Sequence, residues 1–161
     1  MWRLILWLVL SCALLSSAIA GPLEEGIAAY KREDYATALR LLRPLANEGN
    51  PVAQSQLGAM YAEGLGLPQD YSEAIKWYRK AADQGDASAQ FNLGLSYQHG
   101  KGVAQDYVQA HKWANLAAAR SLSSETELRA NAAKLRDFIA EKMTAAQIAE
   151  AQRLASEWKP K

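Results

Sequence analysis

The chain has 161 residues, and its 18 lysine and arginine residues nearly balance its 17 aspartate and glutamate residues, for a formal net charge of +1. This balance argues against nucleic acid and against a strongly anionic membrane surface as partners, because both select basic proteins. A single domain is expected for this length.

Residues 1–20 have the three parts of a secretory signal peptide. Arg3 is the only charge, residues 4–15 are almost wholly apolar, and Ala18-Ile19-Ala20 forms a small-x-small cleavage site. The apolar run is short for a membrane span, so we predict cleavage after Ala20 and export, most simply to the periplasm. An anchor that is not cleaved, lipidation at Cys12 and full secretion are the alternatives.

Cleavage would change the charge and the cysteine count of the mature chain. Loss of Arg3 leaves 18 − 1 = 17 basic residues against 17 acidic ones, and loss of Cys12 leaves no cysteine. An exported chain without disulfides has to be held together by its core. We therefore expect residues 21–158 to form one domain with a continuous apolar core.

Residues 23–50 are predicted to form a degenerate first helix pair. Its connection is short, since Tyr30 lies four residues before Asp34, whereas Tyr61 lies nine residues before Asp70. A terminal repeat is expected to be atypical because one of its sides has no neighbour. Its second half nevertheless returns 36 residues later, in the pairs Asp34/Asp70, Tyr35/Tyr71, Ala38/Ala74, Ala46/Ala82 and Gly49/Gly85.

Residues 51–86 and 87–121 are two full copies of one repeat. A period of this size indicates a solenoid, in which each unit buries its apolar face by stacking on its neighbours. The identities at the fixed offset of 36 include thirteen pairs that define the repeat motif: Ala53/Ala89, Leu57/Leu93, Gly58/Gly94, Tyr61/Tyr97, Gly64/Gly100, Gly66/Gly102, Gln69/Gln105, Asp70/Asp106, Tyr71/Tyr107, Ala74/Ala110, Trp77/Trp113, Ala81/Ala117 and Ala82/Ala118.

Each full repeat is predicted to be an antiparallel helix pair. In the first copy, apolar residues recur at helical spacing up to residue 63, and the glycine-rich stretch 64–68 ends that helix. Asp70 is expected to cap the second helix, with Glu73 three residues on. The second copy departs from the first at Ala114 and Ser121, which stand where the first copy has Tyr78 and Gly85.

Residues 122–158 are predicted to form a helical cap at the C-terminal end of the stack. Ser124-Glu125-Thr126-Glu127 reads as a capping box for a helix to about Lys142, and Thr144 with Gln147 reads as a second one. The last helix is expected to carry Trp158 on its apolar face. The predicted fold is therefore an all-α, right-handed solenoid of antiparallel helix pairs, with about three repeats and this cap.

The repeat pattern resembles that of the Sel-1-like repeat family, which is related to the tetratricopeptide repeat. The motif A-x-x-x-L-G-x-x-Y-x-x-G-x-G, then D-Y-x-x-A-x-x-W, then A-A-x-x-G fixes more than ten positions. The resemblance covers most of residues 23–158, and the cap is similar to the tail of many bacterial members. It implies a non-catalytic adaptor whose first helices line a concave groove.

No catalytic or metal-binding constellation stands out from the sequence. His99 and His111 have no third ligand at metal spacing, so they are interpreted as a loop-end polar group and an exposed helix residue. Ser156 to Lys159 matches S-x-x-K without partner motifs, and we interpret it as coincidence. The recurring aromatic residues, including Tyr71, are interpreted as packing groups rather than a carbohydrate platform.

The candidate binding residues are those that the resemblance places in the groove and that differ between repeats. Phe91 and Leu95 lie outside the repeating core stripe, one turn apart, and would form a shallow apolar pocket. The alternative is that Phe91 packs under the C-terminal cap. The predicted groove residues are Ser55, Ala59, Glu63, Phe91, Leu95, Gln98 and His99.

The main functional hypothesis is an exported, non-enzymatic interaction module that holds a peptide or helix of another envelope protein in this groove. No cofactor or metal is expected, nor membrane contact after signal cleavage, and the chain is compatible with a monomer. One alternative is an envelope hydrolase or a penicillin-binding or β-lactamase-like protein, although the relatives classed that way carry disulfides. The other alternative is a self-associating structural protein.

Overall fold

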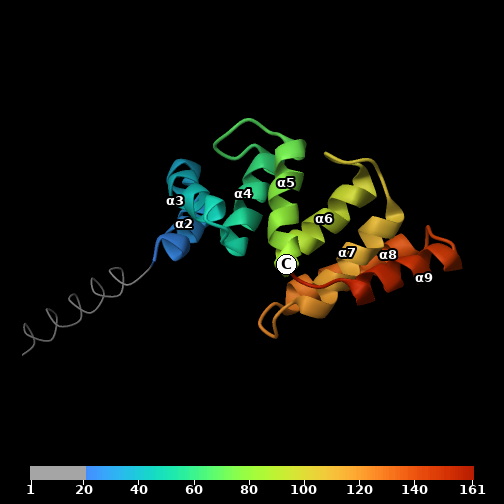
Figure 1. Ribbon diagram of the computed structural model, residues 1–161. Coiled ribbons are helices and arrows are strands. Elements are labelled where there is room, and N and C mark those ends of the chain that lie inside the picture. The colour runs from blue at the N-terminus through green and yellow to red at the C-terminus, as the bar shows by residue number, and fades with distance from the viewer. Residues whose placement is uncertain (1–20) are drawn as a thin grey trace, which may run out of the picture.

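The computed structural model describes residues 21–161, so the predicted signal peptide and Cys12 lie outside the described residues. Regular structure in this part of the chain is entirely helical and forms a curved stack (Figure 1). The predicted all-α solenoid is confirmed. Its helices are α2 (Pro22–Lys31), α3 (Tyr35–Asn47), α4 (Pro51–Glu63), α5 (Tyr71–Asp83), α6 (Ala87–His99), α7 (Tyr107–Arg120), α8 (Thr126–Ala140) and α9 (Ala145–Glu157).

Local side chains set where most helices begin. The Asp70 carboxylate accepts hydrogen bonds from the backbone N–H groups of Ser72 and Glu73, at 2.9 and 3.0 Å, as predicted for a cap. Thr144 and Gln147 form the predicted capping box at α9. Equivalent caps are supplied by Asp34, Asn50, Asp86 and Asp106.

The predicted capping box at Ser124 is wrong. The N-cap of α8 is Glu125, and its side chain makes no capping bond to the helix that it precedes. Its carboxylate instead accepts from the backbone N–H of Leu122 at 2.7 Å, while the Arg129 guanidinium donates to the Ser121 and Leu122 carbonyl groups. These bonds tie the start of α8 to the loop behind it and so replace the expected cap.

The core is divided along the stack into three apolar clusters, each shared by neighbouring units. The first cluster joins α2, α3 and α4 around Leu42, Leu57 and Met60, and Trp77 packs against it. The second joins α5, α6, α7 and α9 and contains Trp113. The third lies between α7 and α8. Equivalent tryptophans thus pack against successive clusters, which is how a solenoid buries apolar surface.

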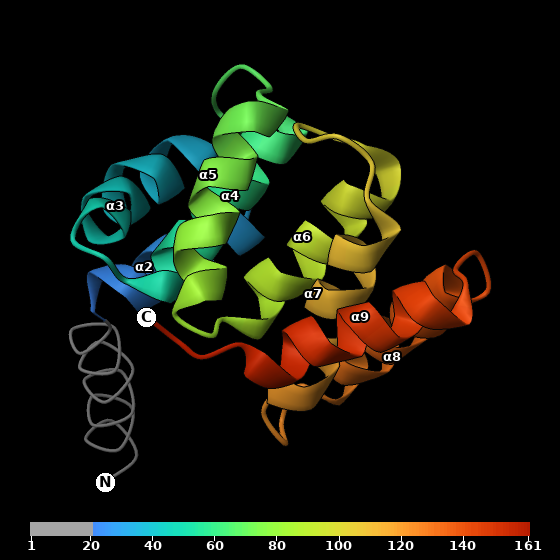
Figure 2. The same ribbon diagram turned by 45° about the vertical axis from the view of Figure 1, so that its right-hand side comes forward.

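The cap differs from a further helix pair of the repeat type. Both α8 and α9 make their main contacts with α7, rather than with each other, on the last side of the stack (Figure 2). Trp158 was expected on the last helix, but α9 ends at Glu157 and Trp158 has an extended backbone just beyond it. Its ring turns back onto Trp113, with ring centroids 6.5 Å apart in an edge-to-face arrangement.

Candidate binding groove

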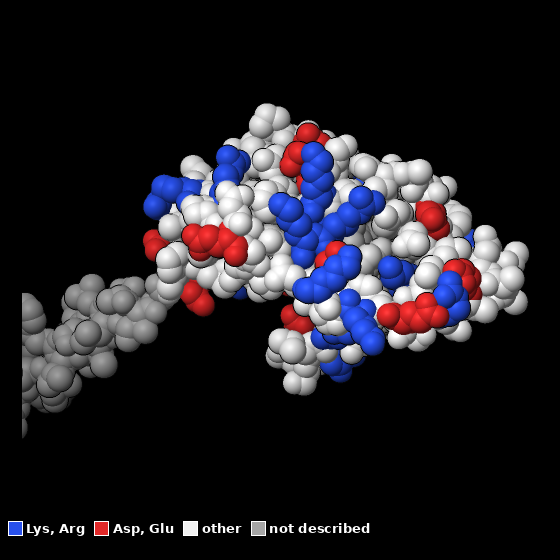
Figure 3. All heavy atoms as spheres, in the orientation of Figure 1, with Lys and Arg blue, Asp and Glu red and all other residues white. Residues whose placement is uncertain are grey.

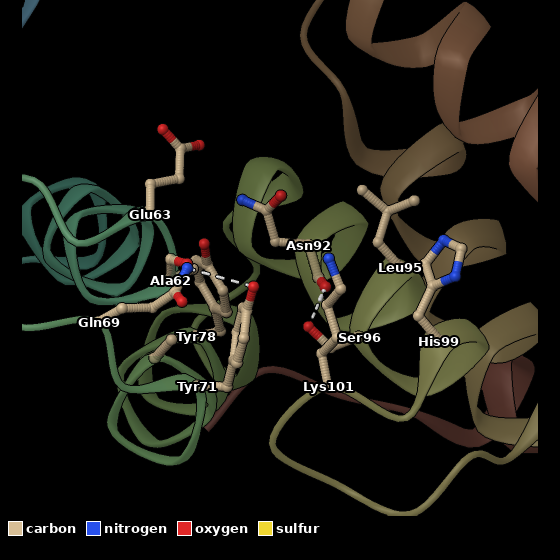
Figure 4. Close-up of a pocket in the computed structure, with 11 residues that line it drawn as sticks. Ala62, Glu63, Gln69, Tyr71, Tyr78, Asn92, Leu95, Ser96, His99 and Lys101 are labelled. Carbon is tan, nitrogen blue, oxygen red and sulfur yellow. Dashed lines mark hydrogen bonds between the residues drawn. The ribbon is translucent and has the colours of Figure 1, made fainter.

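An open groove lies between the second and third repeats. It has a volume of about 480 Å³ and is bounded by the C-terminal end of α4, by the first half of α5 as far as Tyr78, and by α6 (Figure 4). Residues from both sides face one another across it, since Tyr71 and Tyr78 lie opposite Asn92 and Ser96. The groove is lined by Ala62, Glu63, Gln69, Tyr71, Ala74, Tyr78, Asn92, Leu95, Ser96, His99 and Lys101.

The wall formed by the second repeat holds its aromatic side chains in fixed positions. The Gln69 amide donates to the Ala62 carbonyl oxygen at 2.8 Å and to the Tyr71 hydroxyl at 3.2 Å. The bond from Gln69 to the carbonyl recurs one repeat later, where Gln105 donates to the Gln98 carbonyl oxygen. This wall is therefore built by the repeat motif itself.

Tyr78 contributes a largely buried aromatic side chain to the same wall. Its side chain is only 4% exposed, and no described residue forms a hydrogen bond with its hydroxyl. Burial, with a smaller contribution from Glu63, raises the pKa of Tyr78, so the hydroxyl stays protonated. The hydroxyl oxygen is not one of the fully buried polar atoms, so it can exchange a hydrogen bond to water in the groove for one to a ligand.

The opposite wall is a polar face of α6, where Ser96 replaces the methionine of the preceding repeat. The Ser96 hydroxyl donates to the Asn92 backbone carbonyl oxygen at 2.7 Å. The Asn92 side-chain amide forms no hydrogen bond with the described residues. Lys101 closes one end of the groove, with its ammonium 5.4 Å from the centre of the Tyr71 ring. An amide of this kind can donate and accept hydrogen bonds at once.

The structure brings three of the seven predicted groove residues to this groove, namely Glu63, Leu95 and His99. Ala59, Phe91 and Gln98 do not line it, and Ser55 is only 6% exposed.

The apolar pair Phe91 and Leu95 packs against the third cluster, which contains Leu135 and Ile139 of α8. For Phe91 the structure thus supports the alternative that we left open, packing under the C-terminal cap.

Sequence reasoning missed the polar residues that form most of the groove. Tyr71 was assigned to packing alone, yet it lines the groove as well. A signal was present at Ser96, because the equivalent residue of the preceding repeat is Met60, a fully buried core side chain. A core position that becomes polar in the next repeat has left the core, and this could have indicated the groove wall.

The interpretation of His111 as an exposed helix residue is wrong. Its side chain is 3% exposed between α7 and the cap, and its Nδ1 atom has no hydrogen-bond partner among the described residues. Burial lowers the pKa of His111, and the positive charge of Arg136 adds to this effect. The error arose because helical spacing around α7 does not reveal that α8 covers this face.

Other kinds of site find no support among the described residues. The Ser156 hydroxyl of the S-x-x-K match is exposed and donates to the Arg153 carbonyl oxygen of its own helix, as in an ordinary helix surface. Within residues 21–161, no group of three His, Cys, Asp or Glu side chains could hold a metal ion. No helix in the same range has the length and apolar character required to cross a bilayer.

The family profile of the Sel1 repeat matches three successive stretches of the chain, residues 18–50, 51–86 and 87–122. The chain belongs to the Sel1 repeat family. Proteins built from Sel1 repeats are generally protein–protein interaction modules, and their repeats form a scaffold that is generally non-catalytic. A comparison with curated proteins found no match to the chain.

Two solved structures of Sel1 repeat proteins share the fold. One is c5321, a protective antigen present in uropathogenic Escherichia coli strains and displaying an SLR fold, with 31% identity and a TM-score of 0.75. The other is a Sel1 repeat protein from Oxalobacter formigenes, with 34% identity and a TM-score of 0.65. The matches cover 85% and 84% of this chain, but only 29% and 55% of those chains.

Proposed function

We propose that this Sel1 repeat chain is an exported, non-enzymatic interaction module that holds a peptide of another envelope protein in the groove between its second and third repeats. The observation that carries the proposal is the groove itself, where Tyr78 and Asn92 lie on opposite walls and neither side chain forms a hydrogen bond within the described part of the chain. The general role of Sel1 repeats supports protein binding. The predicted signal peptide supports export.

The polarity of the groove favours a peptide main chain as the ligand. Tyr78 can donate a hydrogen bond to a peptide carbonyl group, and the Asn92 amide can pair with both groups of one peptide unit. The groove is about 480 Å³ in volume, which suits a short extended segment better than a helix of about 10–12 Å diameter. A site this short predicts affinity in the micromolar range.

Site-specific crosslinking in the producing cell tests the proposal. A photoreactive benzoyl-phenylalanine is placed at His99, which is exposed at the rim of the groove, or at Gln152, which is exposed on α9. We expect a discrete protein adduct from position 99 and none from position 152. Adducts of the same kind from both positions, or none from either, would contradict the proposal.

The hydroxyl of Tyr78 is tested in the same cells with a matched pair of variants. Tyr78→Phe removes one oxygen atom from the groove wall, and Tyr35→Phe removes one from the first repeat, outside the groove. We expect Tyr78→Phe to weaken the adduct from position 99 about five- to tenfold and Tyr35→Phe to leave it unchanged. An adduct that neither variant alters would show that the partner lies elsewhere.

Export is tested by cell fractionation and by N-terminal sequencing of the mature protein. We expect Gly21 to be its first residue.

A further inference from the structure

Although the formal net charge of the chain is only +1, positive side chains are concentrated in one region of its surface. Lysine and arginine side chains gather in the middle of one face, over α5 and the C-terminal segment (Figure 3). The last residue, Lys161, crosses the end of α5: its backbone N–H donates to the Asp83 carbonyl oxygen at 2.8 Å, and its ammonium lies 3.0 Å from the Asp83 carboxylate. The C-terminal segment therefore adds cations to the end of α5.

Three cations at this place are held over tryptophan rings. The Lys80 ammonium lies 4.2 Å from the centre of the Trp77 ring, and the Lys112 ammonium lies 4.3 Å from that of Trp113. The Arg120 guanidinium lies 4.3 Å from the Trp158 ring. Contacts of this kind fix long side chains that would otherwise lose rotamer freedom on binding.

We name this surface the tail patch and define it as Lys80, Lys112, Arg120, Lys159 and Lys161. Among the described residues, the only ion pair of any member is the one between Lys161 and Asp83. The next carboxylate along the chain, Asp86, is partly buried and accepts the Ala89 backbone N–H at 2.7 Å as the cap of α6. Five cations stand against the Asp83 carboxylate and the terminal carboxylate of Lys161, so the tail patch is net positive.

The tail patch is separate from the groove. Tyr71, which lines the groove, is the first residue of α5, and Asp83 is the last. Twelve residues of helix separate them by about 18 Å. Tyr78, which also lines the groove, is two residues from Lys80, so their side chains leave α5 in nearly opposite directions. A ligand can therefore bind the tail patch whether or not the groove between the second and third repeats is occupied.

We propose that the tail patch is a second docking surface, and that it binds an acidic peptide segment of another protein. Charge complementarity selects an anionic partner. An anionic membrane is less suitable, because interfacial binding also needs apolar side chains that insert, and the exposed large apolar residues Val52, Leu122 and Phe138 are not members of the patch. Stacking of nucleic acid bases is disfavoured as well, because cations already cover the three tryptophan rings.

Fluorescence anisotropy with a labelled alternating aspartate-glutamate decapeptide tests this inference on the purified protein. The patch variant is Lys80→Glu/Lys159→Glu, and the matched control is Lys31→Glu/Lys142→Glu. All four lysines are exposed, both variants change the net charge equally, and each pair includes one lysine over an aromatic ring, since Lys142 lies 4.7 Å from that of Phe138. Melting curves of both variants confirm that they fold.

We expect the patch variant to bind the decapeptide about tenfold more weakly than the natural protein, and the control to bind within about twofold of it. Binding should weaken as salt is raised. Equal losses in both variants would show only a long-range effect of net charge and overturn the proposal. It is also overturned if the natural protein does not bind the decapeptide at low salt, or if it binds phosphatidylglycerol vesicles or a DNA oligonucleotide more tightly than the decapeptide.

Discussion

The aromatic ring of Tyr78 occupies the space that a side chain at Gly58 would need. A β-carbon built at Gly58 would lie 2.7 Å from both Cδ1 and Cε1 of that ring. The equivalent glycine of the next repeat, Gly94, faces Ala114, and the Leu135 side chain of α8 comes within 3.3 Å of its β-carbon position. The cap therefore supplies the apolar group that the third repeat lacks.

We predict that alanine is tolerated much better at Gly94 than at Gly58. Replacing glycine with alanine favours the helix at either position, because glycine loses more backbone entropy on folding. At Gly58, however, the new methyl group would collide with the packed ring of Tyr78. Gly58→Ala should lower the free energy of unfolding by about 1–3 kcal/mol, and Gly94→Ala should change it by less than about 1 kcal/mol. Urea denaturation measures both, and equal losses would contradict the packing described.

Two buried glutamines connect successive repeats. The Gln54 side chain donates to the Ala46 carbonyl oxygen at 3.0 Å, and its equivalent Gln90 donates to that of Ala82 at 3.2 Å. Gln54 also accepts a bond from Gln84 at 2.9 Å.

Gln90 lacks the matching bond, because the residue equivalent to Gln84 is Arg120. The Arg120 guanidinium lies over the Trp158 ring instead. The Oε1 atom of Gln90 is buried without a partner among the described residues.

Methionine at these two positions should therefore have unequal effects. Gln54→Met breaks two hydrogen bonds and should cost about 2 kcal/mol, whereas Gln90→Met breaks one and removes an unpaired oxygen, for about 1 kcal/mol or less. Thermal and urea unfolding of both variants test the order. A larger loss for Gln90→Met would show that the bond to Ala82 contributes more than the geometry indicates.

Acid should destabilise the fold through His111. Because burial lowers the pKa of His111 in the folded state, the unfolded chain binds a proton at higher pH than the folded chain does. Stability should therefore fall as pH drops below the ordinary histidine value of about 6.5. His111→Gln should reduce the fall in melting temperature between pH 7 and 5, and His99→Gln, at an exposed position, should not. Identical pH profiles for all three proteins would refute this.

The C-terminal segment should contribute to stability mainly through one aromatic side chain. Trp158 packs on Trp113 and against the second core cluster, while the ion pair of Lys161 is exposed. Trp158→Ala should cost about 2–3 kcal/mol, less than a fully buried tryptophan, and Lys161→Ala should cost less than about 1 kcal/mol. Chemical denaturation of both variants provides the measurement, and a small effect of Trp158→Ala would show that the segment is not needed for the fold.

Much of the fold could be predicted because its determinants are local and repeated. Asp70 and Thr144 cap their helices wherever the chain places them, since a cap needs only residues two or three positions away. The offset of 36 fixed which helices are equivalent. Ser124 was misassigned because Arg129, eight residues after Ser121, binds the loop and changes the start of α8.

The candidate site was predicted only in part, because it depends on which helix covers which face. Helical spacing identified Phe91 and Leu95 as an apolar pair outside the repeating stripe, but it could not show that they pack against the cluster containing Leu135. The same limit hid the burial of His111.

The helix pairs, their period and most of their caps follow from the order of the amino acids, because hydrogen bonds within a turn and apolar spacing along a helix involve only neighbouring residues. Which faces of the stack remain open and which are covered depends on contacts between distant helices. The cap does not repeat, so no period predicts its contacts. Its packing on α7 buries His111, completes the core beside Ala114 and brings Lys161 to Asp83 at the tail patch.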